Sequence, residues 1–196
     1  MTQVSVIAIG ASLGGLRALQ IVLRALPREL PASVTVAQHR RADPESRLLS
    51  LLARECALPV IEPEDKAPLE QGHVYLAPSD YHLLVERGSL ALSVDPPVQY
   101  ARPSIDVLFE SVADAYGPAA VGVMLTSSSA DGAMGAAAIK RAGGQVLVQD
   151  PETAESPVGP RAVLALTAVD GVLPLEGIGE ALAALTGCAR PSQRAR

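Results

Sequence analysis

Aromatic residues and cysteines are both scarce in this chain of 196 residues. There is no tryptophan and one phenylalanine, and the two cysteines, Cys56 and Cys188, lie far apart. A core without large rings has to be built from Ala, Val, Leu and Ile, which suits helices packed on a parallel sheet. No histidine or cysteine stands at metal-ligand spacing around either cysteine. We therefore expect two free thiols, no disulfide and no bound metal.

The chain also lacks an excess of positive charge and any long apolar run. Its 16 Lys and Arg residues are outnumbered by 21 Asp and Glu residues, for a net charge of −5. Binding to a nucleic-acid backbone relies on clustered Lys and Arg, so we expect no nucleic-acid partner. Gly, Pro or a charged residue interrupts every apolar stretch before the roughly 20 residues that a membrane span needs. With no signal peptide at its start, the chain is expected to be cytoplasmic, without membrane insertion.

What the sequence does contain is an alternation of strand-like and helix-like segments. A short apolar run is followed by apolar residues at three- and four-residue spacing, and the same succession recurs along the chain. Such alternation predicts an α/β domain with a parallel sheet flanked by helices. The predicted strands are 4–9, 34–38, 74–77, 119–125, 145–149 and 169–173, and the predicted helices are 16–26, 48–52, 105–115, 133–141, 161–166 and 178–185.

The middle of the chain departs from this alternation. Short strands at 81–86 and 90–94 are joined across Arg87-Gly88, which predicts a local antiparallel hairpin. Ser104 stands where its side chain can cap the helix that follows. Nothing in the composition marks a second domain, and we expect the last nine residues, 188–196, to fray.

Three polar residues stand directly after predicted parallel strands and before predicted helices. They are Ser12, His39 and Asp131. The carboxyl ends of parallel strands meet at one edge of a sheet, where ligand sites form, so these side chains are expected to lie together. An Asp that orients a His, which in turn activates a Ser, would complete a nucleophilic relay. His73 and His82 are less well placed as a general base, because one precedes its strand and the other lies within the hairpin.

Other interpretations of the first turn remain open at this point. The segment 10–14 matches the nucleophile pattern G-x-S-x-G, but Ser12 could equally cap the following helix. The order Ser, His, acid does not fit the ordinary α/β-hydrolase order. A dinucleotide site is a third interpretation, with Arg40 and Arg41 suggesting NADP, although Ser12 replaces the second glycine of G-x-G-x-x-G.

Several sequence blocks, in this order and spacing, resemble the catalytic domain of the CheB family of chemotaxis methylesterases. The resemblance runs from about residue 4 to residue 185. The blocks are IAIGAS at 7–12, QH at 38–39, LAPSDYHL at 76–83, RPSIDVLF at 102–109, ADGA at 130–133 and RAGG at 141–144.

The resemblance implies a doubly wound, mostly parallel sheet in a Rossmann-like three-layer arrangement, formed by residues 1–187. It implies a hydrolase that removes methyl groups from γ-glutamyl esters on chemoreceptor cytoplasmic helices and deamidates glutamines there, with no cofactor or metal. By position, Ser12 resembles the nucleophile, His39 the general base and acid, and Asp131 the residue that orients His39. The backbone N–H groups of Leu13 and Ser128 are the candidate donors to the oxyanion.

The chain departs from the family pattern in ways that bear on activity. Ser127-Ser128-Ser129 replaces Gly-Met-Gly, and serine does not adopt positive φ as glycine does, so we expect the oxyanion donor to be displaced. The family usually carries an N-terminal phosphorylation-receiver domain, and since the first predicted strand begins at residue 4 we expect none here. A receptor-binding relative with impaired catalysis is therefore an alternative, and an NADP-dependent reductase a more remote one. Arg40 and Arg102, with Arg41 and Arg47, are candidates for binding substrate carboxylates.

Overall fold

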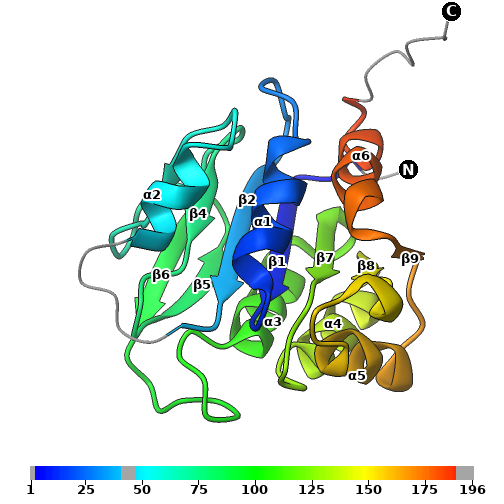
Figure 1. Cartoon of the computed structure of the whole chain (residues 1–196). Helices are drawn as coiled ribbons and strands as arrows, with labels where there is room; N and C mark the ends of the chain where they lie inside the picture. The colour runs from blue at the N-terminus through cyan, green and yellow to red at the C-terminus, as the bar shows by residue number, and fades with distance from the viewer. Residues whose placement is uncertain (1–2, 41–46, 189–196) are drawn as a thin grey trace, which may run out of the picture.

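A seven-stranded parallel sheet forms the centre of the molecule in the computed structural model, which describes residues 3–40 and 47–188 (Figure 1). The strand order is β3-β4-β2-β1-β7-β8-β9, and every neighbouring pair is parallel. The chain builds outward from β1 in one direction and then returns to its other side, which confirms the doubly wound prediction. The strands are β1 (Val6–Ala11), β2 (Ser33–Gln38), β3 (Val60–Ile61), β4 (Val74–Leu76), β7 (Ala120–Met124), β8 (Gln145–Gln149) and β9 (Gly171–Leu173).

Helices cover both faces of this sheet and create two hydrophobic cores. One core joins the sheet to α1, α2 and α6, and the other joins it to α3, α4 and α5. Alternate residues of β1 serve the two cores, as the period of two in a strand requires: Ile7 and Ile9 face the first, and Val6 and Ala8 face the second. The helices are α1 (Gly15–Arg24), α2 (Arg47–Ala53), α3 (Ile105–Tyr116), α4 (Ala133–Arg141), α5 (Val158–Leu166) and α6 (Leu175–Leu185).

The predicted hairpin is confirmed as a separate two-stranded sheet. Strands β5 (His82–Glu86) and β6 (Ser89–Ser93) pair antiparallel, and Gly88 in their turn has a φ of 81°. The hairpin packs on α3, where the Ser111 hydroxyl accepts a hydrogen bond from the Val85 N–H at 2.9 Å. This contact places the hairpin beside the helix whose first turn enters the site described below.

Several element boundaries differ from the predictions. The two-residue strand β3 at the sheet edge was not predicted, since it is too short to show periodicity. Helix α5 begins at Val158 rather than at residue 161, because Pro160 lies in its first turn, where a missing N–H costs no hydrogen bond. Both cysteines are free, as predicted. Cys188 still donates its N–H to the Ala183 carbonyl at 2.8 Å, and the rest of the predicted frayed tail lies outside the described residues.

Candidate active site

Ser12 lies one residue beyond β1, on the turn that leads into α1. Its N–H donates to the Thr126 carbonyl at 3.0 Å, and its carbonyl accepts from the Gly15 N–H at 2.9 Å. The residue that caps α1 is Gly14, whose φ of 78° favours glycine. No side chain caps this helix, so the alternative in which Ser12 serves as the cap is wrong. Within the described parts of the chain, the Ser12 hydroxyl makes no hydrogen bond, and it borders an open cavity.

His39 occupies the equivalent position on the neighbouring strand. Ala11 and Gln38 are in register on β1 and β2, and the His39 N–H donates to the Ala11 carbonyl at 3.0 Å. Ser12 and His39 therefore leave adjacent parallel strands at the same edge, and both line a cavity of about 880 Å³. Within the described chain, no hydrogen bond joins the two side chains. Catalytic contacts of this kind commonly tighten only when substrate is bound.

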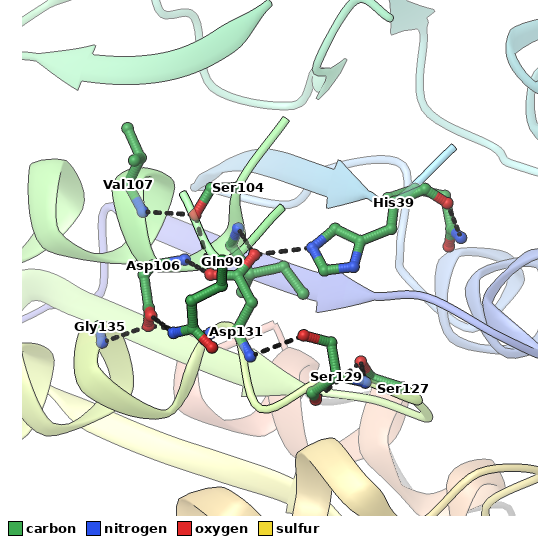
Figure 2. A network of polar contacts seen from close by, with 12 residues as sticks. His39, Gln99, Ser104, Asp106, Val107, Ser127, Ser129, Asp131 and Gly135 are labelled. Atoms are coloured by element: carbon green, nitrogen blue, oxygen red, sulfur yellow. Dashed lines mark hydrogen bonds and ion pairs between the residues drawn. The ribbon is translucent and has the colours of Figure 1, made fainter. Parts of the chain in front are cut away.

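Asp131 completes the cluster from the third strand. It lies beyond β7, and its Oδ2 is 2.7 Å from Nε2 of His39 (Figure 2). The His39 side chain is 14% exposed and the Asp131 side chain is fully buried. A buried carboxylate that accepts the Nε2 proton leaves Nδ1 of the imidazole as the basic nitrogen. All three residues predicted from the strand ends are thus at one site.

The N-terminus of α3 holds the Asp131 carboxylate in place. Oδ1 accepts from the Ser104 hydroxyl at 2.8 Å and from the Asp106 N–H at 3.0 Å, and Oδ2 accepts from the Ile105 N–H at 2.7 Å. Burial opposes the ionisation of Asp131, but the hydrogen bonds from His39, the two backbone N–H groups and Ser104 outweigh it and lower the pKa of this carboxyl. Asp131 is therefore held as a carboxylate, the form that can orient imidazole.

Two backbone N–H groups beside Ser12 have the properties of oxyanion donors. Leu13 and Ser128 both line the cavity, and neither N–H has an acceptor within residues 3–40 and 47–188. A preorganised donor of this kind typically contributes about 2.7 to 4 kcal/mol to stabilising a tetrahedral oxyanion. The cavity that Ser12 lines thus also includes two residues whose N–H groups have no acceptor in the described part of the chain.

The triple-serine loop holds itself together through its own hydroxyl groups. The Ser127 hydroxyl donates to the Ser129 carbonyl and accepts from the Ser129 N–H, both at 3.1 Å, and the Ser129 hydroxyl accepts from the Asp131 N–H. None of these serines has a positive φ. The loop therefore has a conformation that serine adopts without backbone strain, and the displacement of the oxyanion donor stays a prediction.

Two side chains that the sequence analysis did not single out as site residues form hydrogen bonds with the turn that carries Ser12. Gln38 Nε2 donates to the Ser12 carbonyl at 2.8 Å and to the His39 carbonyl at 3.0 Å. The Thr126 hydroxyl donates to the Leu13 carbonyl at 2.8 Å. Gln38 and Thr126 are polar residues at or just beyond the end of a buried strand. That position is the feature of the sequence that could have indicated their role at the site.

The two arginine candidates have different surroundings. Arg40 lines the cavity, but its guanidinium is largely buried and forms an ion pair with Glu62 and a 2.8 Å hydrogen bond to the Ala77 carbonyl. Arg102 is not among the cavity residues; it donates to Asp80 and to the carbonyls of Val94 and Asp95. The structure therefore does not bring Arg102 to the site. Arg47 begins α2, and Arg41 lies outside the described residues.

His82, which was set aside as a base, supports the site indirectly. It is buried, its Nδ1 accepts from the Ser104 N–H at 3.2 Å, and its Nε2 is 3.3 Å from the Pro96 carbonyl. His82 thereby helps to fix the residue that caps α3 and donates to Asp131.

Comparison with known proteins identifies the family. The model of the CheB methylesterase family matches residues 7–182. The chain belongs to the CheB methylesterase family. In the crystal structure of the Thermotoga maritima CheB methylesterase catalytic domain, all of that chain superposes on 94% of this one, with a TM-score of 0.88 and 32% identity. The NADP-dependent reductase alternative is wrong, because the family consists of methylesterases.

Curated relatives extend this similarity. An Anaeromyxobacter dehalogenans protein-glutamate methylesterase/protein-glutamine glutaminase is 46% identical over 184 residues, which are 94% of this chain and 54% of that protein. A Leptospira interrogans protein, which carries the same name as a provisional assignment, is 40% identical to this chain over 175 residues. These residues are 89% of this chain and 91% of that protein. The chain thus spans about half of one relative and nearly all of the other. Among the described residues, no helix is long and apolar enough to cross a membrane.

Proposed function

We propose that this protein hydrolyses γ-glutamyl methyl esters on the cytoplasmic helices of bacterial chemoreceptors, with Ser12, His39 and Asp131 as its catalytic triad. The observation that carries the proposal is the buried Asp131 carboxylate, 2.7 Å from His39, which in turn lines one cavity with Ser12, Leu13 and Ser128. The names of the relatives support methyl ester hydrolysis and add glutamine deamidation. Deamidation needs the same chemistry with ammonia as the leaving group.

The proposed reaction has two halves. Ser12 Oγ attacks the ester carbonyl carbon while Nδ1 of His39 takes its proton, and the resulting oxyanion accepts from the Leu13 and Ser128 N–H groups. The C–O bond to the methoxy group then breaks, and His39 passes the proton to it, so that methanol leaves. Water attacks the acyl carbon with its proton going to His39, and Ser12 departs with that proton, leaving a glutamate carboxylate.

The cavity suggests where substrate is held. Its lining runs from Ser12 along the first turns of α1 to Arg17 and Gln20, and it includes Glu155, whose side chain lies against Gly14. Arg40 is the better placed of the two predicted substrate-binding arginines, because it lines this cavity. No step of the proposed reaction needs a cofactor or a metal ion.

Methanol release from methylated receptor tests the proposal. We expect Ser12→Ala to lower the rate by at least about 10³-fold, since the nucleophile carries the acyl group, with KM little changed. Ser89→Ala, on the hairpin, is the matched control and should release methanol at the wild-type rate. A serine-directed phosphonate should add to Ser12 in the wild type and not in His39→Ala.

Either of two results would overturn the proposal. Equal methanol release by the wild type and Ser12→Ala would show that Ser12 is not the nucleophile. Receptor binding without methanol release or Ser12 labelling would instead support the catalytically impaired relative.

A further inference from the structure

The N-termini of α3 and α4 each hold a carboxylate that comes from the start of the other helix. Asp131, directly before the cap of α4, accepts from the Ile105 and Asp106 N–H groups at the start of α3. In return, Asp106 Oδ1 accepts from the N–H groups of Gly132 and Gly135 at the start of α4, at 2.9 and 2.8 Å. Each carboxylate thus lies on the N-terminus of the other helix, where free N–H groups and the helix dipole favour an anion (Figure 2).

Glycine makes this close crossing of the two helices possible. A Cβ at Gly135 would lie 2.5 Å from Cβ of Phe109 and 3.0 Å from the Asp106 carbonyl oxygen. Gly132 has a φ of 105°, which other residues rarely adopt. Both carboxylates are consequently buried, with Asp106 4% exposed and Asp131 0%. Moving either side chain would disturb the backbone donors of the other.

Asp106 is buried next to negative rather than positive charge. Burial raises the pKa of Asp106 to about 6, with the charges of Asp131 and Glu110 adding to the effect and the N–H groups of Gly135 and Gly132 opposing it. No lysine or arginine of the described chain forms an ion pair with Asp106. The histidines nearby, His39 and His82, are linked to it only through Asp131 and Ser104.

We propose that Asp106 is a positioning residue of the catalytic triad, which holds Asp131 through the exchanged helix N-termini and shifts the lower pH limit of the reaction. The proposal rests on the proposed function of Ser12, His39 and Asp131. Asp106 touches neither the imidazole nor the cavity. It acts on Asp131 by holding the N-terminus of α4, which directly follows Asp131. When ionised, it adds negative charge behind Asp131, next to the pair that Asp131 forms with His39, so the charge state of Asp106 changes how strongly that pair holds a proton.

Gln99 provides the last contact of this carboxyl. Its Nε2 donates to Asp106 Oδ2 at 2.8 Å. Because Oδ1 already accepts two backbone N–H groups, a proton on Asp106 belongs on Oδ2, where rotation of the Gln99 amide would offer its oxygen as acceptor. An asparagine at 106 can satisfy the same partners once the Gln99 amide has rotated, with its oxygen toward the two glycines and its own amide donating to the Gln99 oxygen. Asp106→Asn therefore removes the charge while keeping the contacts.

The experiment compares pH profiles of kcat/KM for methanol release by the wild type, Asp106→Asn and the control Asp114→Asn. Asp114 is an exposed acid of the same helix, outside the site, and its charge is not among those that raise the pKa of Asp106. We expect the acid limb of Asp106→Asn to shift to lower pH by about half a unit and to fit one ionisation, whereas the wild-type limb is broader because two groups titrate together. Asp114→Asn should follow the wild type. Superimposable limbs for the wild type and Asp106→Asn would overturn the proposal.

Carbon-13 NMR of the aspartate carboxyl groups gives a readout that does not need activity. In the wild type and in Ser12→Ala, one aspartate should titrate near pH 6, and this signal should be missing in Asp106→Asn. Titration of every aspartate below about pH 5 would contradict the proposal even if methanol is released. If no methanol is released, the proposed function fails and the NMR titration still decides the state of Asp106. If Asp106→Asn does not fold, a wild-type acid limb that fits a single ionisation would overturn the proposal.

Discussion

Two buried aspartates in adjoining hydrogen-bond networks have pKa values displaced in opposite directions. For Asp131, burial is outweighed by hydrogen bonds from His39, two backbone N–H groups and Ser104, so its pKa is lowered. For Asp106, burial dominates and its pKa rises to about 6. The same chemical group thus serves as a permanent anion in one position and as a titrating group in the other, because the number of donors aimed at each differs.

This difference predicts how stability depends on pH. Since the pKa of Asp106 is raised on folding, the folded protein holds a proton that the unfolded chain loses above about pH 4, and wild-type stability from this group falls as pH rises to about 6. The Asp106→Asn variant has no carboxyl at this position, so its stability does not fall in this way. The free energy of unfolding of the variant minus that of the wild type should therefore increase by on the order of 2 kcal/mol from pH 4 to pH 7. Urea unfolding at both pH values measures this, and a difference that stays constant with pH would contradict it.

The residues that could be predicted are those whose role follows from their place on the strands. Ser12, His39 and Asp131 each directly follow a predicted parallel strand, and the structure brings them to one edge. Asp106 could not be found in this way, because it reads as an ordinary acid in the first turn of a helix. Its role depends on a second helix, which begins at Ala133 and crosses the first one closely.

At the scale of elements, the crossing of α3 and α4 depends on Gly135. An alanine there would meet Phe109 and the Asp106 backbone below ordinary contact distance, so Gly135→Ala should destabilise the protein by roughly 2 kcal/mol or more. Gly177 is the matched control, because it is also the third residue of its helix and nothing lies within 4 Å of its added Cβ. Gly177→Ala should stabilise by about 0.5 to 1 kcal/mol. Thermal unfolding measures both, and equal effects would contradict the close crossing.

The ends of helices and strands could be predicted where a residue next to the boundary ends the element. Helix α4 and strand β8 have the predicted bounds, because Gly143, with a φ of 84°, ends the helix and a short polar-flanked apolar run follows. The starts of α5 and α6 were placed too late, since the prolines at 157, 160 and 174 read as breakers although they lie at or before the first helical turn. A proline's effect depends on its distance from the helix start, and that start is not visible in the sequence.

The order of the strands explains why the site lies where it does in the whole molecule. The chain leaves β1 toward β2 on one side and returns to β7 on the other, so the loops after these three strands diverge at the point where the winding reverses. Ser12, His39 and Asp131 come from those three loops. Figure 1 shows the carboxyl ends of β1 and β2 pointing to the same edge, with the start of α3 beside them.

Strand β1 contributes side chains to both hydrophobic cores. We therefore predict that the whole molecule unfolds cooperatively. Leu19 on α1 belongs to one core, whereas buried Tyr75 packs in the other, on the opposite face of the sheet. Leu19→Ala should cost about 2 to 5 kcal/mol and shift the urea midpoint equally when unfolding is followed by far-ultraviolet circular dichroism and by the near-ultraviolet signal of the tyrosines. Because β1 lends alternate side chains to both cores, loss of one removes the support of the other. Separate midpoints for the two signals would show instead that each face unfolds on its own.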